Sequence, residues 1–107
     1  MANLIPIEHP GRILKEEFMV PLDVTAYQIS KETGISETAL SQIIKGTRGI
    51  SISNALKLSL FFGLSDEYFA NLQMRYTLDL EKEKGCNITA FVPKNKRPSE
   101  DETLLEV

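Results

Sequence analysis

The chain has 107 residues, a formal net charge of −3, 42% hydrophobic residues and 25% charged residues. This length suits one domain and excludes a second catalytic lobe. No apolar run approaches the roughly 20 residues of a membrane span, and the N-terminus lacks a signal-peptide pattern. Cys86 is the sole cysteine, so an internal disulfide is excluded and we expect a cytoplasmic protein with no membrane contact.

The first helix is expected between two prolines. Pro10 suits the first helical turn, where a missing backbone N–H costs nothing, and Pro21 is expected to end the helix. The only histidine, His9, is expected to help begin this helix rather than to catalyse a reaction. The apolar positions of the helix are Ile13, Leu14 and Phe18.

The segment from Ala26 to Lys45 predicts two short helices joined by a glycine turn. Thr25 can cap the first helix, and Gly34 can take the left-handed conformation that ends it. Ser36 can cap the second helix, which runs from Glu37 to Lys45 and ends at Gly46. The apolar residues that would hold the two helices across each other are Ile29, Ile35, Leu40 and Ile43. This pattern is a helix-turn-helix.

Two further helices complete an all-α, five-helix fold. Ser51 can cap the fourth helix, and Gly63 is expected to end it. Its apolar residues cover more than half of the circumference, which predicts a central helix packed on several sides. These residues are Ile52, Ala55, Leu56, Leu60 and Phe61. Ser65 is expected to cap the fifth helix, with Asp66 and Glu67 in its first turn and Gly85 at its end.

The fifth helix carries an apolar stripe, and the last residues differ from the rest. Leu72, Tyr76 and Leu80 follow Phe69 along one face, which either packs on its own domain or, as we favour, forms a dimer interface. We therefore divide the chain into a helix-turn-helix domain, residues 1–84, and a C-terminal tail, residues 85–107.

The tail has a mixed composition. Residues 88–92 are strand-like, the segment after Pro93 is polar, and the chain ends with Leu104, Leu105 and Val107. Either the tail is partly disordered, or a strand or peptide within it is ordered by a partner.

The second helix of the motif offers a polar outer face to DNA. Thr38, Ser41 and Gln42 are the candidates for reading bases, and Gln42 suits a bidentate contact with adenine. Other side chains and helix-terminal amides near the motif can contact phosphates. These candidates are Thr25, Gln28, Ser36, Lys45, Thr47 and Arg48.

The charge distribution predicts a dimer. Residues 9–64 have a net charge of +1, whereas six basic residues face nine acidic ones from Ser65 onward. A weakly basic module binds DNA modestly alone, so two copies on a palindromic operator are expected. One histidine and one cysteine cannot build a zinc tetrad or a Cys-His pair, and no phosphate-binding glycine motif occurs. We expect no catalytic residue, no metal and no cofactor.

Three motifs carry a resemblance to a known family. They are H-P-G-R-I-L-K-E-E-F from His9, G-I-S-E-T-A-L-S-Q-I-I-K-G-T-R-G-I-S from Gly34 and A-L-K-L-S-L-F-F-G-L-S-D-E-Y-F-A-N-L-Q from Ala55. Over residues 4–82 the chain resembles the HigA/VapI-type antitoxins of the phage-repressor-like helix-turn-helix superfamily. The resemblance implies a dimer that represses its own operon and neutralises a co-encoded HigB/RelE-type toxin, an mRNA endonuclease.

One departure from the family matters for DNA contacts. Ala26 stands where such proteins often carry a glutamine that touches phosphate, which shifts that expectation to Thr25 and Gln28. Two alternatives stay open: a free-standing repressor without a toxin, and a protein-interaction module in which the helix-turn-helix is vestigial.

Overall fold

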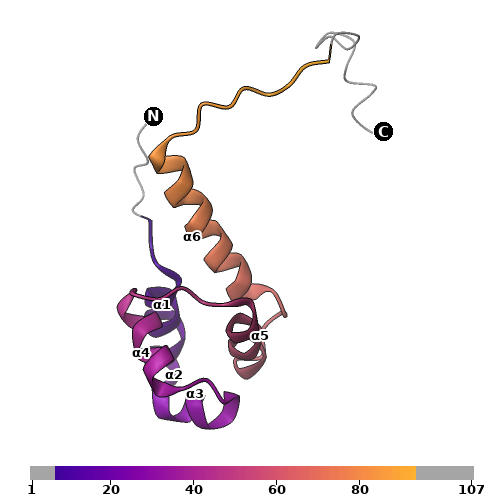
Figure 1. Ribbon diagram of the computed structural model, residues 1–107. Helices are drawn as coiled ribbons and strands as arrows, with labels where there is room; N and C mark the ends of the chain where they lie inside the picture. Colours follow the sequence, from indigo (N-terminus) through magenta and orange to yellow (C-terminus); the bar gives the residue numbers. More distant parts are fainter. Residues whose placement is uncertain (1–6, 94–107) are drawn as a thin grey trace.

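The computed structural model describes residues 7–93, and the predictions on Leu104, Leu105 and Val107 lie outside this range. Its described residues form helices and no strand, arranged as in Figure 1. In chain order these are α1 (Pro10–Ile13), the π-helix η1 (Leu14–Met19), α2 (Val20–Leu22), α3 (Ala26–Thr33), α4 (Glu37–Lys45), α5 (Ile52–Phe61) and α6 (Tyr68–Lys84). The elements α1, η1 and α2 follow one another directly and correspond to the first predicted helix, so the five-helix prediction is confirmed. None of the described helices is long and apolar enough to cross a membrane.

The first helix begins as predicted and ends differently. His9 is its N-cap residue, and the Nδ1 atom of the ring accepts a hydrogen bond from the Gly11 amide at 2.9 Å. Pro21 does not end the helix, which continues to Leu22 and stops at Asp23 in the left-handed conformation, with φ 57°. A wider π-turn directly before a proline relieves the clash between its ring and the preceding turn, which accounts for this continuation.

The π-helical turn decides which face of the first helix is buried. Leu14 is fully buried and Met19 is 8% exposed. Residues five apart lie on different faces of an α-helix, but the i→i+5 hydrogen bonds of a π-turn bring them to the same face. The Val20 amide makes such a bond to the Lys15 carbonyl.

The core joins the first helix to the predicted helix-turn-helix. All four residues expected to hold α3 and α4 together are buried, which confirms that prediction: Ile29, Ile35, Leu40 and Ile43. The approach of α1 to α4 is unusually close, because a Cβ atom on Gly11 would overlap the backbone carbonyl of Ile43. The glycine of the H-P-G motif therefore lets α4 rest directly on the start of the first helix.

Helix α5 is not packed on several sides, so that prediction is wrong. Only Ala55, Leu58 and Ser59 of this helix are buried. Ile52, Leu56 and Leu60 are 76%, 42% and 58% exposed. These three residues recur every four positions and form one outer stripe, since only the inner face meets α3 and α6.

Helix α6 begins later than expected. The helix starts at Tyr68, after Ser65, Asp66 and Glu67. The side chain of its N-cap residue, Glu67, makes no capping hydrogen bond. The buried Ser59 hydroxyl of α5 instead accepts a hydrogen bond from the Phe69 amide at 3.2 Å. A contact across the fold therefore replaces the local serine cap.

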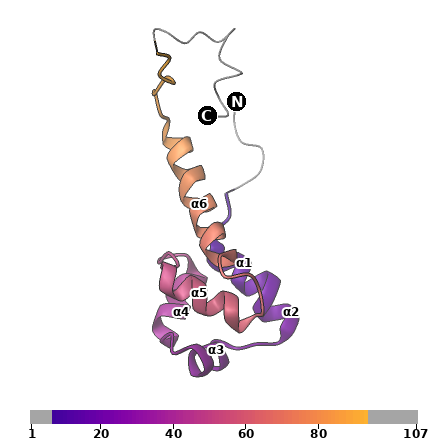
Figure 2. The ribbon, with the colours of Figure 1, turned by 90° about the vertical axis from the view of Figure 1, so that its right-hand side faces the viewer.

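The far half of α6 extends away from the other helices, as both views of the molecule show (Figures 1 and 2). Beyond it, residues 85–93 form neither helix nor strand, so the strand-like composition of residues 88–92 does not produce a strand in this chain. Ile88 and Phe91 are 83% and 85% exposed.

Candidate nucleic-acid interface

Both helices of the motif are fixed by the caps that the sequence predicted. Thr25 and Gln28 form a capping box: the Thr25 hydroxyl accepts from the Gln28 amide at 3.1 Å, and the Gln28 Oε1 atom accepts from the Thr25 amide at 2.9 Å. Gly34 ends α3 with φ 83°, and the Ser36 hydroxyl caps α4 by accepting from the Ala39 amide at 3.0 Å. The turn therefore lies between two helix ends that are each capped by hydrogen bonds.

Helix α4 has a buried inner face and a polar outer face. Ala39, Leu40 and Ile43 are buried, whereas Thr38 is exposed and Ser41 and Gln42 are partly exposed. All three candidate base-reading side chains thus reach the surface on one helix. The exposed Lys45 lies at the C-terminal end of the same helix.

Several phosphate candidates also hold the backbone. The Gln28 side-chain oxygen is used in the capping box, so its NH₂ group is the part suited to a phosphate. The Thr47 amide and hydroxyl both donate to the Gln42 carbonyl, at 3.0 and 3.2 Å. Thr47 therefore closes the C-terminus of α4, and a phosphate contact would compete with that role.

The loop after α4 carries further phosphate candidates. Gly46 has φ 87°, and its amide donates to the Ile43 carbonyl at 3.0 Å, which with the Thr47 amide bond makes a Schellman motif. Arg48 follows and is exposed. Lys45, Thr47 and Arg48 are thus grouped at the C-terminal end of α4.

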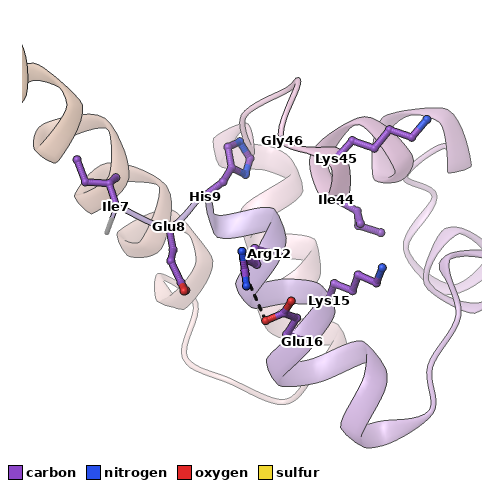
Figure 3. Close-up of a pocket in the computed structure, with 9 residues that line it drawn as sticks. All are labelled: Ile7, Glu8, His9, Arg12, Lys15, Glu16, Ile44, Lys45 and Gly46. Atoms are coloured by element: carbon purple, nitrogen blue, oxygen red, sulfur yellow. Dashed lines mark hydrogen bonds and ion pairs between the residues drawn. The ribbon is translucent and has the colours of Figure 1, made fainter. Parts of the chain in front are cut away.

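The structure places two further basic residues beside the phosphate candidate Lys45, and the sequence did not identify them as candidates. Arg12 of α1 and Lys15 of η1 lie with Lys45 around an open hollow of about 650 Å³ (Figure 3). Arg12 is paired with Glu16, with Nε and Oε1 3.3 Å apart, so part of its charge is balanced locally. The close contact of α1 with α4 groups these residues, and the H-P-G glycine was the sequence signal for that contact.

His9 also lines this hollow, and its surroundings favour the neutral form of the ring. Burial lowers the pKa of His9 below its usual 6.5, and a hydrogen bond to the Arg48 backbone opposes this shift. The neutral ring is the form that can accept the Gly11 amide at Nδ1. His9 therefore acts as a helix cap, as the sequence suggested.

The proposed dimer residues divide between two environments. Leu72 packs against the core, and the Tyr76 ring meets the His9 ring edge-on, with centroids 4.8 Å apart. Leu80 lies further along α6, is partly exposed and lines a surface hollow with Thr77 and Lys84. Within the described chain, Leu80 is thus the residue of the three best able to meet a second subunit.

Comparisons with known proteins agree with this geometry. Residues 14–69 match the helix-turn-helix family. Virulence-associated protein I of Dichelobacter nodosus is 31% identical over 91 residues, which cover 85% of this chain and 84% of that protein. The Pseudomonas aeruginosa antitoxin HigA, solved with the higBA promoter, has a TM-score of 0.71 at 27% identity, covering 81% of this chain and all of that one. An addiction module antidote protein of the HigA family from Coxiella burnetii has a TM-score of 0.70 at 30% identity, again covering 81% and 100%.

The family model covers more than half of the chain, and the relative and the two solved structures each match at least 81% of it. The chain belongs to the helix-turn-helix family. Its resemblance to the HigA/VapI-type antitoxins, which the three sequence motifs indicated, is confirmed, and the chain carries the DNA-binding fold of that group.

Proposed function

We propose that this protein binds operator DNA as a homodimer, represses its own operon and neutralises a co-encoded toxin of the HigB/RelE type. The observation that carries the proposal is the outer face of α4, where Thr38, Ser41 and Gln42 reach the surface of a helix capped at both ends. The related Pseudomonas aeruginosa antitoxin HigA was solved with the higBA promoter, which supports the same use of this fold. The protein acts by binding and not by catalysis.

Operator binding is tested by separating base contacts from phosphate contacts. Gln42→Ala should weaken operator binding by about 1–3 kcal/mol and leave nonspecific DNA binding nearly unchanged, because only base contacts are lost. Lys45→Ala or Arg48→Ala should weaken binding to all sequences and lower the slope of log K against log salt by about one. Fluorescence anisotropy across a salt series measures both effects. Equal loss of specific and nonspecific affinity in Gln42→Ala would contradict the role of α4.

The dimer follows from the weak charge of the module. Residues 9–64 have a net charge of only +1, so a single copy neutralises few phosphates. A two-fold dimer would set two α4 helices about 34–36 Å apart on a palindrome. Sedimentation should show a dimer at micromolar concentration that Leu80→Glu weakens more than the surface control Lys31→Ala. A monomer that footprints one half-site would rule this out.

The toxin contact is proposed on charge. A toxin that acts on ribosome-bound mRNA must carry a basic surface, and an acidic surface on the antitoxin would compete for it. The acidic excess of this chain lies beyond Ser65 and includes Glu100, Asp101, Glu102 and Glu106, which lie outside the described residues. We therefore propose that the toxin contacts α6 or the tail, leaving α4 free for DNA.

Truncation after Lys84 tests this assignment. Residues 85–93 add no helix or strand, so the shortened protein should still bind operator DNA while its toxin affinity or on-rate falls. Unchanged neutralisation would exclude the tail and direct attention to the exposed side of α6. A small basic protein that co-purifies with the full chain distinguishes an antitoxin from a free-standing repressor, and loss of DNA retention at low salt would favour a protein-interaction module.

A further inference from the structure

The loop between α4 and α5, residues 46–50, connects the base-reading helix to the rest of the protein. It carries Thr47 and Arg48, two of the phosphate candidates, and both are exposed. Its first part is closed by the Schellman bonds of Gly46 and Thr47. Its remaining residues, 48–50, have no helix or strand to hold their backbone.

Gln73 of α6 holds the end of this loop. Its Oε1 atom accepts a hydrogen bond from the Ile50 amide at 2.8 Å, a contact between residues 23 apart in the chain. The neighbouring Gly49 lies close to the same amide: a Cβ atom there would be 3.2 Å from both Nε2 and Oε1 of Gln73, so a side chain at this position would displace the loop or the Gln73 amide by a few tenths of an ångström. The Nε2 atom of Gln73 donates to the Thr77 hydroxyl at 3.1 Å, which fixes the orientation of the amide.

The beginning of the loop rests on the same face of α6. Tyr76 is three residues from Gln73, and its ring packs edge-on against His9 with centroids 4.8 Å apart. The imidazole of His9 lies beside the start of the loop, because a Cβ atom on Gly46 would be in ordinary van der Waals contact with it, 3.8 Å from Cγ, and the ring also hydrogen-bonds to the Arg48 backbone. One face of α6 therefore supports both ends of the loop: Gln73 directly, and Tyr76 through His9.

We propose that Gln73 is a positioning residue for DNA binding: it holds the Gly46–Ile50 loop in the shape that presents Arg48 to a phosphate. This inference rests on the operator binding proposed above. Gln73 itself need not touch DNA, because its amide is already used by the loop and by Thr77. Operator affinity is thus made dependent on α6, the helix to which a second subunit or a toxin is expected to bind.

The test compares two single substitutions at neighbouring positions of α6, each made in the full-length protein. Gln73→Met keeps the length of the side chain and removes the acceptor for Ile50. Met74→Gln is the matched control, since Met74 is 56% exposed on the next position of the helix. Gln73→Met should weaken operator binding about five- to tenfold, the range expected when one backbone amide loses its partner. Met74→Gln should change binding less than twofold.

Two readouts separate positioning from a loss of stability. In a double-mutant cycle, Gln73→Met should cost less than twofold once Arg48→Ala has removed the contact that the loop presents. In the absence of DNA, the Ile50 amide should exchange faster in Gln73→Met, while the amides of α3 and α4 exchange as in the wild type. Fully additive losses in the cycle, or an unchanged Ile50 exchange rate, would overturn the proposal.

A second variant approaches the same contact from the loop. If Gln73→Met fails to fold, Gly49→Ala should displace the loop or the Gln73 amide, loosen the bond from Ile50 to Gln73 and weaken operator binding. Unchanged affinity with unchanged Ile50 exchange would overturn the proposal. A wild-type protein that binds no operator overturns the proposed function together with this inference. A wild-type protein that binds operator, with Gln73→Met equal to Met74→Gln, overturns the inference alone.

Discussion

Helices α4 and α5 are alike in construction and differ in what they present to solvent. Each begins at a serine whose hydroxyl accepts from the amide three residues later, Ser36 from Ala39 at 3.0 Å and Ser51 from Asn54 at 3.2 Å. Both bury one face in the same core. The outer face of α4 is polar, whereas that of α5 exposes Ile52, Leu56 and Leu60.

The difference shows that apolar content and burial are separate properties of a helix. On α4, the residues that the sequence pattern assigned to the core, Leu40 and Ile43, are fully buried, so the pattern was sufficient. On α5, apolar residues lie on both faces, and only the position of the neighbouring helices decides which face is covered. A polar outer face suits the hydrogen bonding of nucleic acid, and an apolar one does not.

The largest expected effect is a difference in unfolding free energy between substitutions on the two faces of α5. Leu58→Ala should lower the free energy of unfolding by about 2–5 kcal/mol, because Leu58 is fully buried. Leu60→Ala should change it by about 0.5 kcal/mol or less, because Leu60 is 58% exposed. Urea denaturation measures both values. Similar losses for the two leucines would show that the outer face of α5 is covered in solution.

The next effect concerns the support of α4. Gly11→Ala should destabilise the fold by about 1–3 kcal/mol, because the new methyl group would overlap the Ile43 carbonyl and force α1 and α4 apart. Arg12→Ala is the control on the neighbouring exposed residue, whose surface ion pair contributes little. A Gly11→Ala protein as stable as the control would show that α1 does not rest on α4 as described.

Removal of either serine cap should destabilise the fold to the same extent, but only one of the two removals should also weaken DNA binding. Ser36→Ala and Ser51→Ala should each cost about 1 kcal/mol of unfolding free energy. Only Ser36→Ala should also weaken operator binding, because Ser36 is a phosphate candidate at the start of α4. Thermal unfolding and anisotropy on the same samples test this. Equal losses of operator affinity would remove the functional distinction between the two helix starts.

The smallest effect is the pH dependence of His9. Its pKa is lowered in the folded state, so the unfolded chain binds the proton more readily as the pH falls below 6.5. The stability contributed by the neutral ring is complete above pH 6.5 and is lost as the pH falls through the folded-state pKa. His9→Asn retains a capping oxygen and should show a flatter melting temperature between pH 7 and about 5.5, a range in which carboxylates stay charged. Identical profiles would contradict the role of the ring.

Local signals predicted more of this molecule than distant contacts did. Caps and glycines defined α3 and α4 because each acts within a few residues, and Ile29, Leu40 and Ile43 are buried as their spacing required. The start of α6 could not be predicted in this way, because the Phe69 amide is capped by Ser59, a residue ten positions earlier in the chain. The bond from Ile50 to Gln73 likewise needs the completed fold. The predicted DNA-contacting residues reach the surface, and their contacts stay predictions.

The π-turn of the first helix also bears on how such sequences diverge. It accommodates one residue more than an α-helical turn between Leu14 and Met19, while both stay on the buried face. Deleting the exposed Glu17 would bring these two residues to a spacing of four, which an ordinary α-helix also places on one face. A relative one residue shorter in this segment would therefore keep the same core, and an alignment without a gap there would pair buried positions with exposed ones.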